Sequence, residues 1–352
     1  MDVLLRPGDS IRTYFWNVDW ERRLHITMDR IEDALFDYPA AAFEWAQELP
    51  ELFALRPARV TDVHQLRAEA LEATARGLVG RLEEAEANLA DVLTRAKASR
   101  AMPEDLVGWM HAKYASMLIR LDRNDEAARV IDEGHDRLVL KTPEVTTARA
   151  QLHICQALIH HSRGDWVKAR AHYKIAYDMT EHRKKIQGGY YRRGDITKTS
   201  ALVNFLHVTA HLEPDVKKRL AYISNELILP RHSIRADWGF APYHEVVTAA
   251  MVGRLQMEAG ETLQALPNVE YSARGFLKLR MPVEALDMVL DLAAIQPHHQ
   301  TVSRVFRFVL QQKRLSPKLI ELVRRGGLDH AAAIRQEIAA ERKRRGQARV
   351  AA

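Results

Sequence analysis

The chain has 352 residues, a net charge of +6 and 47% hydrophobic residues, which excludes an intrinsically disordered chain. No apolar run reaches the roughly 18 to 20 residues that a membrane-spanning helix needs, so we expect no membrane contact. Residues 1–7 lack the basic start and apolar stretch of a secretion signal. The single cysteine, Cys155, excludes an internal disulfide framework, and we expect a cytoplasmic protein in which this thiol is buried in a helix.

A turn followed by an apolar helical pattern recurs along the first half of the chain. Each copy has a small residue a few positions after its turn, and these residues are separated by 44, 42 and 42 positions: Ala41, Ala85, Ala127 and Ala169. Twelve positions before each of the last three lies another alanine: Ala73, Ala115 and Ala157. Small residues at matched positions let two helices cross closely, so the pattern predicts repeated helix–turn–helix units. The first copy has Asp29 at the equivalent position, which indicates a degenerate or capping unit.

The clearest copy is the stretch 164–176, where a Gly-Asp turn precedes Trp166 and then Ala169, Tyr173 and Ala176. This stretch resembles the second helix of a tetratricopeptide (TPR) repeat. Because the period is nearer 42 than 34 residues, the resemblance is to longer-period TPR-like arrays. Such arrays occur in bacterial Rap-type peptide-sensing proteins and in the sensor domains of maltose-activator-type transcription factors. The resemblance covers roughly residues 20–295 and implies that Trp166 and Tyr173 serve repeat packing; no helix-turn-helix is evident in residues 1–60.

The same register continues less clearly toward the C-terminus. Residues 215–219 fit a fifth unit, and residues 260–265 fit a sixth with Gly253 at the helix crossing. We therefore predict an all-α, right-handed TPR-like α-solenoid of about six helix-turn-helix repeats. Residues 1–295 would form the solenoid, with a basic insertion at 182–195, and residues 296–352 a helical C-terminal cap with a basic tail.

The first helix of each TPR pair lines the concave groove, and exposed positions there usually contact a peptide or helix. The candidate groove residues are Trp109, Gln151, His161, Asn204 and His207. Trp109 and Leu158 fit an interhelical core equally well, since aromatic and apolar residues at helical spacing are commonly core. We expect a non-enzymatic regulatory or adaptor protein that binds a peptide or protein segment, needs no cofactor, and could form a homo-oligomer.

The insertion combines basic and aromatic side chains, which suits contact with phosphates and bases or with an acidic peptide. Its candidate binding residues are Arg183, Lys184, Lys185, Tyr190, Tyr191, Arg192 and Arg193. A second basic cluster lies at residues 342–345. Both clusters have structural alternatives, because charge runs commonly form solvated surfaces and cations are favoured near helix C-termini. A nucleic-acid-associated regulator is therefore the alternative function.

A third hypothesis is a metal-dependent enzyme, since His207 and His211 are four residues apart on one helix face. Nearby residues supply no evident third ligand or catalytic carboxylate, with Glu213 the nearest candidate, and ordinary polar or core histidines explain the pair as well. The chain contains no Gly-rich phosphate loop and no Gly-x-Ser-x-Gly motif. We therefore expect neither a catalytic site nor a bound metal.

Replacing the five basic residues of the insertion with glutamine tests the nucleic-acid alternative. If these residues contact phosphates, affinity for DNA or RNA falls with salt by about one power of concentration per phosphate, and the substitutions flatten that slope. Fluorescence anisotropy at several salt concentrations measures it. The absence of any binding at low salt would rule out the alternative, and unfolding of the variant would show that the insertion is structural.

Overall fold

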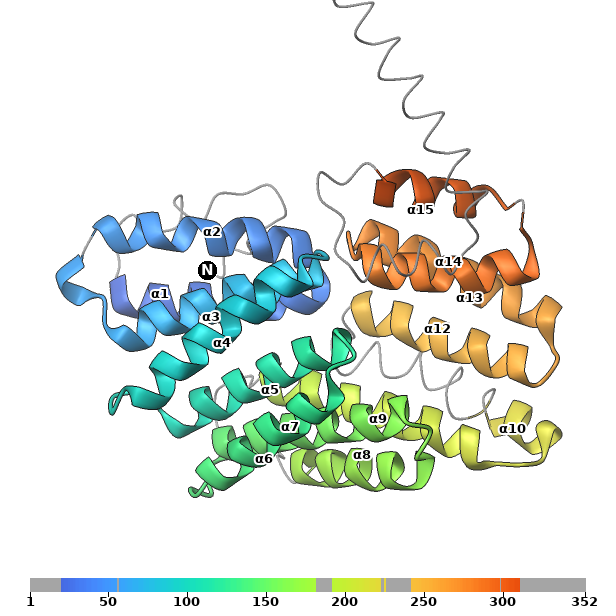
Figure 1. Cartoon of the computed structure of the whole chain (residues 1–352), viewed down its shortest axis with the longest axis horizontal. Coiled ribbons are helices and arrows are strands. Elements are labelled where there is room, and N and C mark those ends of the chain that lie inside the picture. Colours follow the sequence, from blue (N-terminus) through green and yellow to red (C-terminus); the bar gives the residue numbers. More distant parts are fainter. Residues whose placement is uncertain are drawn as a thin grey trace, which may run out of the picture. The chain divides into compact units, whose positions relative to one another are not determined.

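We describe the fold from a computed structural model (Figure 1). The structure describes residues 20–55, 57–181, 192–222, 225, 242–297 and 299–310. Within these ranges every regular element is a helix, which confirms the predicted all-α class. The helices begin and end as follows: α1 (Trp20–Asp37), α2 (Pro39–Leu55), the short 3-10 helix η2 (Pro57–Arg59), α3 (Asp62–Leu78), α4 (Leu82–Ala98), α5 (Glu104–Arg120), α6 (Asn124–Arg137), α7 (Pro143–Ser162), α8 (Trp166–Glu181), α9 (Arg192–Leu212), α10 (Val216–Tyr222), α12 (Pro242–Glu258), α13 (Thr262–Lys278), α14 (Pro282–Ile295) and α15 (Gln300–Leu310).

The chain divides into two compact units, Met1–Glu245 and Val246–Ala352. In the first unit, helices adjacent in sequence pack as hairpins, and α1, α3, α5 and α7 each also pack against the next odd-numbered helix (Figure 1). In the second unit, α13 packs against both α14 and α15. Helix α15 also packs on α14, and the expected boundary after residue 295 stays a prediction. The right-handed solenoid stays a prediction.

The hairpins share one turn geometry. Five of the described residues have a positive φ, and each lies in a turn between two helices: Gly80, Asp122, Gly164, Gly260 and Arg280. After each of them, the next backbone N–H donates to the carbonyl five residues earlier, as Asp165 does to His160 at 2.9 Å. This is the Schellman arrangement that ends a helix and reverses the chain. The first three positions are 42 residues apart, so the predicted period is a structural one.

The small residues identified in the sequence lie in the core between paired helices. Ala115 and Ala127 belong to one buried cluster, and Ala157 and Ala169 belong to another that includes Tyr173. All five side chains are 0% exposed. Close helix approach at these positions therefore accounts for the recurring alanines, and Tyr173 is a packing residue as expected.

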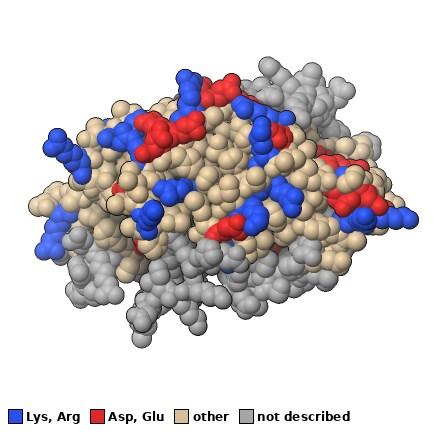
Figure 2. Space-filling view, turned by 90° about the horizontal axis from the view of Figure 1, so that it is seen from below, with Lys and Arg blue, Asp and Glu red and all other residues tan. Residues whose placement is uncertain are grey.

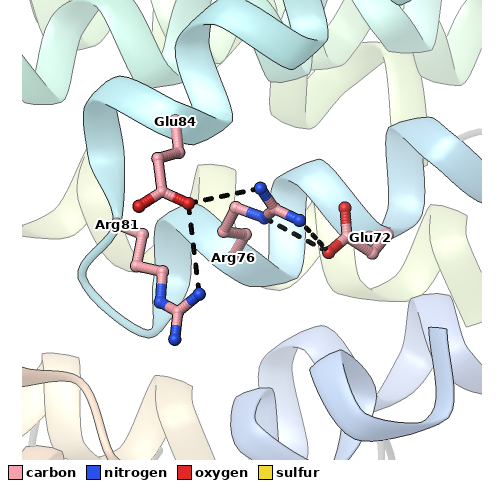
Figure 3. A network of polar contacts seen from close by, with 4 residues as sticks. All are labelled: Glu72, Arg76, Arg81 and Glu84. Carbon is pink, nitrogen blue, oxygen red and sulfur yellow. Dashed lines mark hydrogen bonds and ion pairs between the residues drawn. The ribbon is translucent and has the colours of Figure 1, made fainter. Parts of the chain in front are cut away.

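Charged side chains add contacts across the hairpins. In the α3–α4 hairpin, Arg76 lies 2.6 Å from Glu72 and 3.3 Å from Glu84, and Arg81 lies 4.0 Å from Glu84 (Figure 3). Arg123, directly before α6, also lies 3.1 Å from Glu86 of α4 and thereby joins successive hairpins. Ion pairs that water can reach contribute little to stability, commonly about 0 to 1 kcal/mol, so the apolar crossings carry most of the packing energy.

Substituting Gly164 tests the turn geometry. A Cβ at this position would have no atom within 4 Å, while φ is +73°, so an alanine there suffers backbone strain without a steric clash. We expect Gly164→Ala to lower the free energy of unfolding by about 1 to 2 kcal/mol. Gly164→Asn should cost less, because asparagine tolerates the left-handed region. Denaturant unfolding checks this, and an alanine variant as stable as the wild type would contradict it.

Enlarging Ala169 tests the helix crossing. Ala169→Leu places extra atoms in a site that is 0% exposed, and overpacking should cost about 1 to 3 kcal/mol. The matched control is Ala171→Leu, two residues later on the exposed face of α8. Thermal unfolding followed by circular dichroism compares the two variants. Equal stability of both would show that Ala169 does not lie at a tight crossing.

Candidate functional site

The predicted groove residues have different environments in the structure. Trp109 on α5 is 0% exposed, and the Nζ of Lys113 lies 5.5 Å from its ring centre. The indole therefore belongs to the packing between helices, which is the alternative that the sequence left open, and it presents no surface to a ligand. Leu158 is half-buried and packs against the cluster around Tyr173.

The two predicted amide side chains make contacts within the fold. Gln151 Nε2 on α7 donates to Thr197 Oγ1 on α9 at 3.1 Å, and it thus joins two helices. Asn204 Nδ2 donates to the carbonyl of Ser200, one turn earlier in α9, at 2.8 Å. A ligand that used either amide would have to compete with these hydrogen bonds. Their role in binding stays a prediction.

His161 and His207 are the two predicted residues that the fold brings together. Their ring centres lie 5.4 Å apart, between the end of α7 and the middle of α9. Two further rings complete the group. Trp166, at the start of α8, lies 4.8 Å from His161 and stacks on His211 of α9 at 4.2 Å with an angle of 13°, and His211 lies 4.9 Å from His207.

We call the rings of His161, Trp166 and His211 the aromatic edge. They are half-buried and come from α7, α8 and α9, whereas His207 behind them is only 5% exposed. Burial lowers the pKa of His211 to about 4, and the positive charges of His161 and Arg219 act in the same direction. The His211 imidazole is therefore neutral at pH 7, so it has one nitrogen that donates and one that accepts a hydrogen bond. Stacking and hydrogen bonding are the interactions that this edge offers.

A second group of rings lies between α6, α7 and α8, and sequence reasoning missed it. We call its members, one from α6, two from α7 and one from α8, the histidine row: His135, His153, His160 and His172. His153 and His160 are seven residues apart and thus share one face of α7, which is the one signal that the sequence carries. The His207–His211 pair was considered as a metal clip. Among the described residues, no group of three or more His, Cys, Asp or Glu side chains is placed to hold a metal ion.

Cys155 on α7 is buried as predicted, and its thiol donates to the carbonyl of Ala112 at 3.4 Å. Burial raises the pKa of this thiol to about 12. The thiolate that a nucleophile needs is therefore strongly disfavoured. Cys155 is a core residue of the α5–α7 contact.

The basic insertion lies mostly outside the described residues. That is the case for Arg183, Lys184, Lys185, Tyr190 and Tyr191, and also for the tail at 342–345. Arg192 and Arg193 are in the first turn of α9.

Surface charge bears on the nucleic-acid alternative, and helix length bears on the expectation of no membrane contact. On the face shown in Figure 2, Lys and Arg side chains lie among Asp and Glu side chains, and the described part of that face carries no continuous basic area. None of the described helices is both long and apolar enough to cross a membrane.

Comparisons with protein-family models and with curated proteins find no match to this chain. Among solved structures, the chain is similar to the crystal structure of BtubC (BKLC) from P. vanneervenii. The two share 17% sequence identity with a TM-score of 0.43, over 74% of this chain and 91% of that chain. At this level, the likeness supports no inference about function or partners.

Proposed function

We propose that the protein is a non-enzymatic binding scaffold, a right-handed TPR-like solenoid that recognises a peptide or protein segment. The aromatic edge of His161, Trp166 and His211 is the part of the scaffold that we assign to this contact. The observation that carries the proposal is the stacking of Trp166 on His211, which places an indole from one helical hairpin against an imidazole from the next.

The composition of the edge suits protein recognition. Tryptophan is among the residues enriched at interface positions that dominate binding energy, because its large ring loses little conformational entropy on binding. Trp166 already contacts two imidazoles, so a partner would meet a preorganised ring. The neutral imidazole of His211 adds hydrogen-bonding capacity without the desolvation cost of a charge.

The repeat arrangement also favours a binding scaffold. The hairpins of the first unit contact mainly their neighbours, so small shifts at successive contacts can add up to a change in shape when a partner binds. Gln151 and Thr197 fix α7 relative to α9, the two helices that contribute imidazoles to the edge. A regulatory or adaptor role follows from such a surface, whereas nucleic-acid binding would depend on the insertion and tail.

Substituting Trp166 tests the proposal. A library of displayed random peptides is selected on the immobilised wild-type protein, and the dissociation constants of enriched peptides are measured for wild type, Trp166→Leu and Val167→Ala. Val167 is the matched control because it is adjacent, 68% exposed and outside the edge. We expect Trp166→Leu to weaken binding by about tenfold or more, and Val167→Ala to leave it unchanged.

A parallel pull-down from native lysate uses the same three proteins with and without nuclease. Partners retained by wild type and Val167→Ala but lost by Trp166→Leu in both arms would agree with the proposal. Enriched peptides that bind Trp166→Leu as tightly as the wild type would contradict it. Retention that disappears only after nuclease treatment would favour the nucleic-acid alternative instead. Circular dichroism confirms beforehand that each variant is folded.

A further inference from the structure

The histidine row joins three helices through imidazole contacts. The ring of His135 on α6 lies 4.6 Å from that of His153 on α7, which lies 5.4 Å from that of His172 on α8. His160, two turns along α7, stacks on the other side of His172 at 5.5 Å with an angle of 9°. The row therefore bridges two successive hairpins, α5–α6 and α7–α8.

The central contact of the row requires a neutral imidazole. The Nδ1 atoms of His153 and His172 lie 3.2 Å apart, at hydrogen-bond distance. One nitrogen must donate a proton and the other must accept it, so at least one of the two rings carries no proton on Nδ1. If both rings became imidazolium ions, two N–H donors and two positive charges would face each other at this distance.

The groups around His153 do not compensate a positive charge. The pKa of His153 is lowered to about 4, first by burial and then by its charged neighbours His135, His172 and Arg149. The pKa of His172 is also lowered, first by burial and then by His160. Charging either ring therefore opposes the packing of α6 and α8 on α7.

Carboxylates lie nearer the ends of the row. Burial lowers the pKa of His135, with Arg149 and His172 acting in the same direction and Asp132 and Asp136 of α6 opposing it. Burial likewise lowers the pKa of His160, which also faces charged groups of the α7–α8 turn and of α8: Asp165, Lys168 and Arg163. Asp165, with Oδ2 3.8 Å from His160 Nδ1, raises this pKa, whereas the two cations lower it.

We propose that the histidine row is an acid-sensitive latch that holds α6 and α8 on α7 while its imidazoles are neutral and releases them when it takes up protons. The latch does not require a partner at the aromatic edge. Because the pKa values are depressed in the packed state, protons bind the opened state more tightly. The packing is fully favoured above about pH 6.5, the ordinary histidine value, and weakens as the pH falls toward 4.

Hydrogen–deuterium exchange of the full-length protein between pH 7.5 and pH 5 tests the latch. After correction for the intrinsic exchange rate, we expect exchange in α6 and α8 to rise below pH 6.5 by up to about tenfold per pH unit for each proton taken up. Peptides from α13 in the second unit serve as an internal reference. The double variant His153→Gln, His172→Gln should lose most of this rise, because glutamine retains a polar side chain and does not titrate.

The control variant is His299→Gln, which removes a histidine of the second unit that lies near Glu270 and outside the row. It should retain the wild-type response. A corrected exchange rate in α6 and α8 that does not change with pH would overturn the proposal. So would a double variant that responds as strongly as the wild type.

If the double variant fails to fold at pH 7.5, the wild-type protein alone decides the question. Proton–carbon NMR of the imidazole rings should then reveal a group of histidines that stay neutral well below pH 6.5 and that protonate together with the increase in exchange. Titration of every imidazole near its ordinary pKa of about 6.5 would overturn the proposal.

Discussion

The fold depends on one local constraint, a left-handed residue that ends a helix five positions before a small residue in the next helix. Gly80 precedes Ala85 in this way, and Gly164 precedes Ala169. The positive φ reverses the chain within a few residues, and the small side chain, 0% exposed in both cases, lets the second helix lie close to the first. The turn and the small residue thus set the geometry within each hairpin. The rings of the aromatic edge and the histidine row lie on helices of such hairpins.

Local signals account for what could be predicted from the sequence. Glycines and small residues at a 42-residue spacing identified the hairpins, because turn conformation and close packing each demand particular residue types. The turn at Arg280 was harder to predict from the sequence, since a non-glycine residue occupies the left-handed position there. Hydrophobic periodicity identifies an apolar helix face, but it does not say whether that face packs against another helix or binds a partner. Trp109 is an example, since its buried ring packs between helices.

Contacts between side chains on different hairpins could not be predicted from spacing alone. His135, His153 and His172 come from three helices, and whether their rings meet depends on the register between hairpins. The contact between Trp166 and His211 could not be predicted either. The sequence indicated a packing role for Trp166 and a possible metal-ligand role for His211. Residues that lie in the insertion were singled out by composition, and composition indicates chemistry but not position.

Helix α7 connects the two groups of rings. It contributes His153 and His160 to the histidine row and His161 to the aromatic edge, and consecutive residues of a helix point in different directions. A change in the packing of α7 against α8 would therefore alter the ring contacts of both groups. In our proposals, partner binding at the edge and protonation of the row act on the same hairpin contact, which offers a physical basis for coupling between them.

The central claim is that the first unit is an array of hairpins coupled through neighbouring contacts. Native-state hydrogen exchange of an Ala127→Leu variant tests it most directly, because Ala127 is 0% exposed in the core formed between α5, α6 and α7. The account predicts faster exchange in these helices and in the adjacent α4 and α8, with unchanged exchange in α1 and in α13. A uniform increase in exchange along the whole chain would contradict it.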